Sequence, residues 1–304
     1  MKTYIEFVKS YRKLFTQARK VSMGKASAFG EGKNLLSSKE LRISDSDKKT
    51  LHAKIKKLGL TPRVLVFAPH PDDECMNSLA VRFMTECGFE IVDVAVTLGS
   101  NVERRKGRLA ELKDACDFMG WKIAKLAFDR INPKARDDKK YWAECVEKTK
   151  ALVEKMKPAV IIAPHVEDWN KTHIGTSMLV SDALAKASWN GVRIEGELWQ
   201  AMSTPNLLIE VSDGHLAAQI GALSCHTKEV ERNPYHLNLP AYYTDNVRRG
   251  AEIVGGQGGD APTFQFGQIY RVLEKRGKVY KSAFNSKILT VEQSVEELLA
   301  QLWK

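Results

Sequence analysis

The sequence predicts an α/β fold with one mostly parallel sheet. From residue 63 onwards, short apolar runs alternate with longer amphipathic stretches, which is the pattern of strands joined by helical crossovers. The first run ends at a proline followed by ionisable side chains, and such sheets carry their sites at the carboxyl ends of strands. We therefore predict a Rossmann-like, doubly wound sheet of strand order 3-2-1-4-5, with helices on both faces and a smaller C-terminal α+β part.

The elements of the sheet follow one another in regular alternation. Each strand candidate is a short run of apolar and β-branched residues, and each helix candidate is a longer stretch between two such runs. The predicted strands are residues 64–67, 91–98, 123–128 and 159–163, and the predicted helices are residues 74–87, 103–119, 139–155 and 174–188. In the predicted order the first and fourth strands are neighbours.

The C-terminal part mixes strand and helix patterns. The candidates are strands at residues 198–203 and 207–211, a helix at 215–226, a hairpin of 268–273 with 278–283, and a last helix that a capping box opens at 290–293. A glycine-rich stretch at residues 255–259 lacks the Lys-Ser or Lys-Thr ending of a phosphate-binding loop, so we do not expect it to bind nucleotides.

The N-terminal segment carries the net charge of the chain. Residues 1–60 hold 15 Lys or Arg and 5 Asp or Glu, whereas the two kinds of charge balance in the rest. Residues 3–20 place apolar side chains at helical spacing among basic ones, residues 22–40 have the composition of a linker, and residues 45–58 predict a short helix. We therefore expect a basic helical extension and linker at 1–60 and one large domain at 61–304.

The charge distribution and the cysteines limit the expected partners. Basic residues confined to an extension do not favour a nucleic-acid-binding protein, whose basic residues gather on a folded face. The basic helix docks either on the body or a second subunit, which allows a homo-oligomer, or on an anionic membrane surface or an acidic partner. No apolar run approaches the roughly 18 residues of a membrane helix. Five cysteines without a CxxC pair, and no signal-peptide pattern, predict a cytoplasmic protein.

Histidine and aspartate side chains follow two neighbouring strands. His70, Asp72 and Asp73 come directly after the first strand, and His173 opens the helix after the fourth. These clusters are expected to meet in the crevice where the connections of the sheet diverge. His70, Asp73 and His173 would then supply the three protein ligands of a catalytic zinc site, which keeps an open position. Asp72 would be the general base that deprotonates water beside the metal.

These residues carry a family resemblance. The segment A-P-H-P-D-D-E at residues 68–74 resembles the AHPDDE motif of the zinc-dependent N-acetylglucosaminyl deacetylases, the PIG-L/LmbE family. Arg108, Glu111, Ala115 and Gly120 are similar to its R-x-x-E-x-x-x-A-x-x-x-x-G helix, His173 to its second metal-binding motif, and Ala222, Leu223 and His226 to its late A-L-x-x-H segment. The resemblance covers about residues 63–270.

The resemblance implies an enzyme that hydrolyses the N-acetyl group of an amino sugar or its conjugate and releases acetate. It implies zinc bound by His70, Asp73 and His173, with Asp72 as a base that later protonates the leaving amine. His226 would enter the cleft and touch the substrate or the oxyanion. Since an amide is a poor electrophile with a poor leaving group, an activated water, an oxyanion stabiliser and a proton donor are all needed.

Other residues near the strand ends are candidates for substrate binding. Asp168 and Asn170 lie in the segment similar to the family's D-x-H-x-D-H pattern. His165 lies next to the metal ligands, faces the substrate or is simply hydrogen-bonded, and Trp169 stacks on a sugar ring or packs against protein. Arg108 either reaches the cleft to anchor hydroxyls or phosphate, or pairs with a carboxylate three residues later on a solvated helix face.

The chain departs from the family pattern near the third ligand. Asn170 stands where members carry histidine, and Thr172 where they carry aspartate. Two alternatives to a sugar deacetylase follow. One is a metal-dependent hydrolase of another amide or of an ester, and the other is a non-catalytic zinc- or sugar-binding protein with an altered site. Measurements of metal content and of acetate release would distinguish the sugar deacetylase from these two alternatives.

Overall fold

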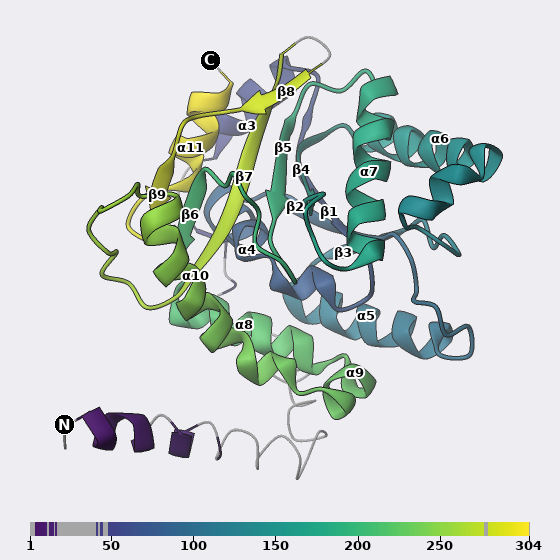
Figure 1. Cartoon of the computed structure of the whole chain (residues 1–304). Coiled ribbons are helices and arrows are strands. Elements are labelled where there is room, and N and C mark those ends of the chain that lie inside the picture. Colours follow the sequence, from purple (N-terminus) through teal and green to yellow (C-terminus); the bar gives the residue numbers. More distant parts are fainter. Residues whose placement is uncertain are drawn as a thin grey trace.

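The computed structural model describes residues 4–10, 12–14, 16, 41, 43–44, 48–276 and 279–303. Within these residues one sheet of nine strands forms the centre of the molecule, in the order β3-β2-β1-β4-β5-β7-β6-β9, with β8 paired to β7 (Figure 1). The first five strands in this order are parallel, which confirms the predicted doubly wound, mostly parallel sheet. The strand order differs slightly from the predicted 3-2-1-4-5, because β7, β6 and β9 continue the same sheet beyond β5.

The strands at the centre of the sheet are buried on both faces. The parallel strands are β1 (Thr61–Ala68), β2 (Glu90–Ala95), β3 (Lys122–Lys125), β4 (Pro158–Pro164) and β5 (Val192–Gly196). All of β4 and the second half of β1 are buried, which explains their continuous apolar sequence. Val66 of β1 lies opposite Ile162 of β4, so the chain leaves these two strands at adjacent points of one sheet edge.

Helices between the parallel strands flank the sheet. They are α4 (Ser78–Cys87), α5 (Arg105–Met119), α6 (Lys139–Met156) and α7 (Lys171–Lys186), close to their predicted ranges. Helix α6 packs against α7, and both lie together in Figure 1, whereas α5 packs against α8 (Asp213–Ser224). The strand order reverses between β1 and β4, and right-handed crossovers therefore place the two pairs of helices on opposite faces.

The predicted strand at residues 198–203 is wrong. The fifth strand is Val192–Gly196, and its sequence contains Arg193 and Glu195, which pair at 2.7 Å inside the fold. These charges hide the strand from a search for apolar runs. In the segment 198–203, by contrast, side-chain carboxylates accept the backbone N–H groups of Trp199, Met202 and Ser203. The segment is therefore a loop held by carboxylates and not by a sheet ladder.

The C-terminal strands extend the same sheet. They are β6 (Leu207–Glu210), β7 (Gly267–Arg276), β8 (Val279–Ser282) and β9 (Lys287–Leu289), and the predicted hairpin is the antiparallel pair of β7 with β8. The last helix, α11 (Val295–Leu302), starts later than predicted, because Ser294 caps it. The side chain of Gln293 does accept the backbone N–H of Thr290, but in the turn before the helix.

Four described elements lie between β6 and β7, and the sequence predicted one of them. Helix α8 confirms the helix predicted at residues 215–226 but ends two residues earlier. Helix α9 (Thr227–Arg232), the 3-10 helix η5 (Tyr235–Asn238) and helix α10 (Leu239–Ile253) follow it and were not predicted. The glycine-rich stretch 255–259 follows α10 and leads towards β7, and it opens no described helix.

The N-terminal segment is described only in part. Residues 4–10 are helical, as expected, and the predicted linker at 22–40 lies outside the described residues. Helix α3 (Lys49–Lys57) corresponds to the short helix expected at 45–58, and it buries Leu51 and Ile55 in the core beside β1. The boundary at residue 60 stays a prediction. Among the described helices, none has the length and apolar character needed to span a membrane.

Candidate metal and catalytic site

Two histidines and an aspartate converge where β1 and β4 end. His70 and Asp73 belong to the turn that leads from β1 into the 3-10 helix η3 (Asp73–Met76), and His173 lies in the first turn of α7. One carboxylate oxygen of Asp73, Oδ2, lies 3.2 Å from His70 Nδ1 and 3.2 Å from His173 Nε2. Ligand atoms of the three residues all lie within 4.8 Å of one another. The sequence therefore predicted correctly that these residues come together.

The donor set fits a zinc ion. Two imidazoles and one carboxylate form a usual three-residue set of catalytic zinc. His173 is completely buried, yet its Nε2 atom has no hydrogen-bond partner within the described part of the chain, although it faces Asp73. His70 is partly exposed, with 21% of its side chain accessible, so one side of the group opens outward. A buried nitrogen without a partner is costly, and a cation between these atoms would satisfy it.

The second nitrogen of His173 faces Asp168. Nδ1 of His173 lies 3.5 Å from Asp168 Oδ2. Asp168 is itself fixed, because it accepts the backbone N–H groups of Asn170 and Trp199. A carboxylate behind a metal-ligating histidine fixes its tautomer and ring orientation. The buried position of Asp168 thus favours orientation of His173 over the predicted contact with substrate.

Protonation of the group is strongly perturbed. Burial favours the neutral carboxyl of Asp73, but the two adjacent imidazoles, His173 before His70, hold its pKa well below the usual range. Burial likewise favours neutral His173, but the Asp73 and Asp168 carboxylates raise its pKa to about 10. A metal ion would displace that proton, since only neutral imidazole coordinates.

Asp72 lies beside the ligands in a strained backbone conformation. Its φ of 125° lies in the region that favours glycine, a conformation that costs about 1–3 kcal/mol and is concentrated at functional sites. The Tyr235 hydroxyl donates a hydrogen bond of 2.6 Å to Asp72 Oδ2. Burial, and next the Asp73 carboxylate, raise the pKa of Asp72 to about 7. A carboxyl with that pKa can both accept and release a proton near neutral pH.

Arg108 reaches the site from α5. Its Nη2 atom donates to the carbonyl of Pro71 at 2.8 Å and lies 3.6 Å from Asp72 Oδ1. Glu111 does not pair with it, because Glu111 accepts from the Thr227 hydroxyl and the Lys228 backbone at the start of α9. The interpretation of a solvated Arg–Glu pair is therefore wrong, and Arg108 lies at the turn that carries Asp72.

His226 is buried behind Asp72 and is held by Glu74. Its Nε2 atom lies 2.6 Å from Glu74 Oε1, and Glu74 Oε2 accepts the backbone N–H of Asp72. Burial favours the neutral ring, but the Glu74 carboxylate raises the pKa of His226. Glu74 therefore joins the turn of Asp72 to the late histidine, and an imidazolium here would lie near any negative charge at the site.

The remaining candidates lie in the stretch between β4 and the start of α7. His165 is buried, with Nε2 at 2.9 Å from the Gln200 carbonyl, which agrees with the hydrogen-bonded interpretation. Asn170 is the N-cap of α7, and its side chain accepts the Thr172 backbone N–H. Trp169 is 74% exposed, so it is not packed in the core.

Tyr235 was missed from the sequence, although it contacts Asp72. It belongs to η5, between two helices without a recognisable motif, and 163 residues separate it from Asp72. Glu74 was read only as part of the motif, but it fixes both Asp72 and His226. A search for unassigned tyrosines in the late segment would have found Tyr235, but nothing in the sequence distinguishes it from Tyr242 and Tyr243.

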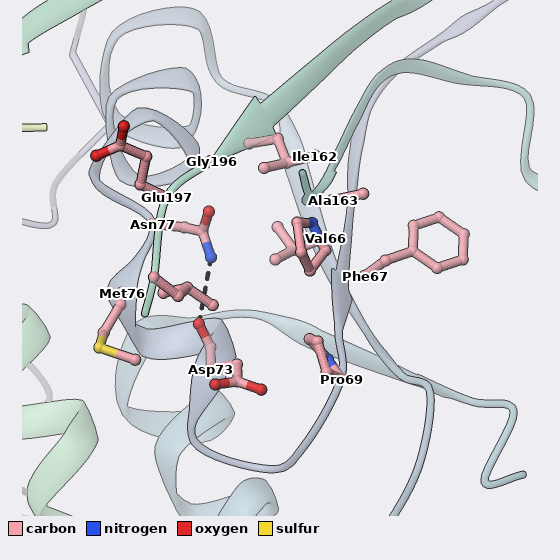
Figure 2. Close-up of a pocket in the computed structure, with 12 residues that line it drawn as sticks. Val66, Phe67, Pro69, Asp73, Met76, Asn77, Ile162, Ala163, Gly196 and Glu197 are labelled. Carbon is pink, nitrogen blue, oxygen red and sulfur yellow. Dashed lines mark hydrogen bonds between the residues drawn. The ribbon is translucent and has the colours of Figure 1, made fainter. Parts of the chain in front are cut away.

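A narrow cavity of about 20 Å³ continues from the ligands into the sheet. Figure 2 shows Asp73 at one end of it and the apolar side chains of Val66 and Ile162 further in. Asn77 donates to the backbone carbonyl of Asp73 at 3.3 Å, which holds the 3-10 turn. The cavity has room for about one water molecule, so a substrate binds outside it.

The sequence of the site segment matches a known family. Residues 65–184, which contain His70, Asp72, Asp73 and His173, match the model of the PIG-L family, described as GlcNAc-PI de-N-acetylase. The resemblance to PIG-L is confirmed. A search of curated proteins found no match to this sequence.

Solved structures share the fold at low sequence identity. The antimicrobial pseudoaglycone deacetylase Dbv21 aligns with a TM-score of 0.53 and 14% identity, over 71% of this chain and 99% of its own. The zinc-inhibited form of teicoplanin deacetylase Orf2 aligns with a TM-score of 0.53 and 13% identity, over 71% of this chain and 99% of its own. GalB, the 4-carboxy-2-hydroxymuconate hydratase of Pseudomonas putida, aligns with a TM-score of 0.53 and 12% identity, over 70% of this chain and 97% of its own. At these identities the likeness establishes the fold, and the match to the PIG-L model covers residues 65–184.

Proposed function

We propose that this protein is a zinc-dependent hydrolase that removes the N-acetyl group from an N-acetylated amino sugar or its conjugate. The observation that carries the proposal is the convergence of His70, Asp73 and His173 beside Asp72, inside the segment that matches PIG-L. The pseudoaglycone deacetylase Dbv21 and the teicoplanin deacetylase Orf2, which share this fold, support it.

His70, Asp73 and His173 would hold the zinc ion. Bound zinc acts as a Lewis acid towards a carbonyl and lowers the pKa of water near it. Asp168 keeps the His173 ring in place, and the exposed side of His70 leaves room for a substrate to approach.

Asp72 would move the proton. In its ionised form it takes a proton from the attacking water, and it then gives that proton to the leaving amine. Its pKa of about 7 suits both steps, because neither protonation state is strongly favoured at neutral pH. Tyr235 and Arg108 hold the carboxylate and its turn from two sides.

His226 would stabilise negative charge that develops beside Asp72. The Glu74 carboxylate holds one ring nitrogen and favours the charged ring, while Nδ1 makes no hydrogen bond to a described residue. A charged His226 would thereby replace the histidine that family members carry at position 170. Asn170 cannot supply a positive charge, and its side chain caps α7.

A different metal-dependent reaction is the second candidate. GalB is a hydratase and shares this fold, so the fold by itself does not fix the reaction. The same ligand set and general base would serve an amide or ester other than an acetylated sugar. Only product analysis separates these chemistries.

The decisive experiment measures zinc and acetate together. The purified chain should hold about one zinc ion, and it should release acetate from members of a panel of N-acetylglucosamine conjugates. Asp72→Asn should retain zinc and lose about 10²- to 10⁴-fold in kcat. Asp129→Asn, an exposed aspartate paired with Arg105, should behave like the unaltered chain. Bound zinc without acetate release from any member of the panel would refute the proposal.

A further inference from the structure

A second and larger cavity lies next to the candidate site. Its volume is about 210 Å³. It lies between the 3-10 helix η3, the loop after β5, and the segment from η5 to the start of α10. Its lining residues are Met76, Leu198, Trp199, Tyr235, Asn238, Leu239 and Tyr242.

The wall of this cavity is almost entirely carbon. Both tyrosine hydroxyls are already engaged, because Tyr235 donates to Asp72 and Tyr242 donates to the Glu197 carbonyl at 2.9 Å. The rings therefore present their carbon surfaces to the cavity. Asn238 supplies the one amide side chain of the lining, and it is exposed. Trp199 is 54% exposed, so its side chain is accessible to a group that enters the cavity.

The cavity adjoins the reacting groups directly. Tyr235 links the two, since its ring lines the cavity and its hydroxyl bonds Asp72. Met76 and Leu198 border both this cavity and the narrow one that Asp73 lines. A substituent attached near a scissile amide beside Asp72 would thus lie close to the apolar wall.

We propose that this cavity binds a hydrocarbon group attached close to the scissile amide of the substrate. The proposal rests on the proposed function and names the substrate class: an amino-sugar amide that carries either an acyl group longer than acetyl or an apolar aglycone. Acetate and unsubstituted sugar hydroxyls leave the apolar wall exposed to water, whereas a hydrocarbon group covers it. Trp199 and Tyr235 are the principal contacts.

The size of the cavity sets the size of the group. Apolar cavities of about 150 Å³ accept benzene. A cavity of about 210 Å³ therefore accepts a phenyl ring or a chain of about six carbons. Each methylene group buried is expected to raise kcat/KM about threefold to fourfold until the cavity is full.

The experiment uses two substrate series with the zinc-loaded full chain. One series extends the acyl group of N-acylglucosamine from acetyl to octanoyl, and the other extends the alkyl group of N-acetylglucosamine glycosides from methyl to octyl. The rise of kcat/KM should occur in one series, which identifies the source of the hydrocarbon. Trp199→Ala should remove most of that rise, and the exposed position of Trp199 makes misfolding of this variant a small risk. Ile253→Ala, an exposed apolar residue of α10 outside the lining, should keep the rise.

Binding separates this inference from the proposed function. The affinity of hexyl and methyl glycosides of glucosamine, measured by calorimetry, needs no catalysis. Tighter binding of the hexyl compound that Trp199→Ala abolishes would support the cavity even if no amide is hydrolysed. A kcat/KM for amide hydrolysis that is equal along both series, or a rise that persists in Trp199→Ala, would overturn the inference and leave the deacetylase intact. Equal binding of both glycosides, together with equal binding of N-acetylglucosamine and N-hexanoylglucosamine and no hydrolysis of any compound, would overturn both.

Discussion

The Tyr235 hydroxyl lies 2.6 Å from Oδ2 of Asp72, and it joins a late 3-10 helix to the turn after the first strand. It is a hydrogen bond to the group proposed as general base. A donor to the ionised carboxylate favours that form and so opposes the burial that raises the pKa of Asp72.

Tyr235→Phe should therefore raise the pKa of Asp72. Because the ionised carboxylate is the active base, the acidic limb of kcat/KM should move about one pH unit higher, in line with the loss of a hydrogen bond to a charged group. The measurement is the pH profile of acetate release. Tyr141→Phe, whose hydroxyl accepts the Arg130 backbone N–H, is the control. An unchanged pH profile in Tyr235→Phe would show that the hydroxyl does not act on Asp72.

Asp168→Asn should weaken zinc binding. The amide removes the negative charge behind His173 Nδ1 and with it the orientation of the ring, so affinity should fall about 10- to 100-fold. Competition with a coloured chelator measures this directly. Glu167→Gln is the matched control, since Glu167 lies on the same loop but pairs with Arg271. Equal affinities in the two variants would argue against an orienting role.

Gly175→Ala should destabilise the fold. A Cβ atom at Gly175 would lie 2.5 Å from the Asn132 Cα, which is backbone and cannot turn aside. We expect a loss of about 1–3 kcal/mol in the free energy of unfolding, measured in urea. At Gly107 in α5 an added Cβ meets nothing within 4 Å. Gly107→Ala should accordingly raise stability by about 0.5–1 kcal/mol, and a loss there would contradict the packing described.

Asp93→Val should stabilise the protein most at high pH. The Asp93 carboxyl is buried in β2 without a hydrogen bond to any described residue, and burial raises its pKa well above the usual range. The folded chain therefore keeps a proton that the unfolded chain has lost, so stability falls as pH rises above about 4. The gain from Asp93→Val should grow by up to about 1.4 kcal/mol per pH unit. Urea unfolding at pH 5, 6.5 and 8 tests this; a gain independent of pH would contradict it.

The first half of the molecule could be predicted because its signals are local. The apolar strands β1 and β4 and the motif at residues 70–74 lie in short stretches whose meaning depends on few neighbours. Strand β5 was missed for the opposite reason. Arg193 and Glu195 belong in a core strand only because each is paired there, and Arg271 of β7 completes the network from 76 residues away.

The parts of the site from the C-terminal segment could not be predicted for a similar reason. Tyr235 reaches Asp72 because α8 packs on α5 and α9 begins on Glu111. The departures at Asn170 and Thr172 were visible in the sequence. The effect of these departures on the site could not be predicted. It depends on the capping of α7 by Asn170 and on the contact between His226 and Glu74, which lie far apart in the sequence.

The proposed zinc ligands and the apolar cavity come from different stretches of the chain. The ligands and Asp72 lie between residues 70 and 173, whereas most of the cavity wall lies between 198 and 242. Insertions or substitutions in the later stretch can therefore alter which molecule is recognised while the metal centre stays whole. The fold in this way allows evolution to change selectivity and reactivity independently, and chimaeras joined after α7 would be a practical route to new deacylases.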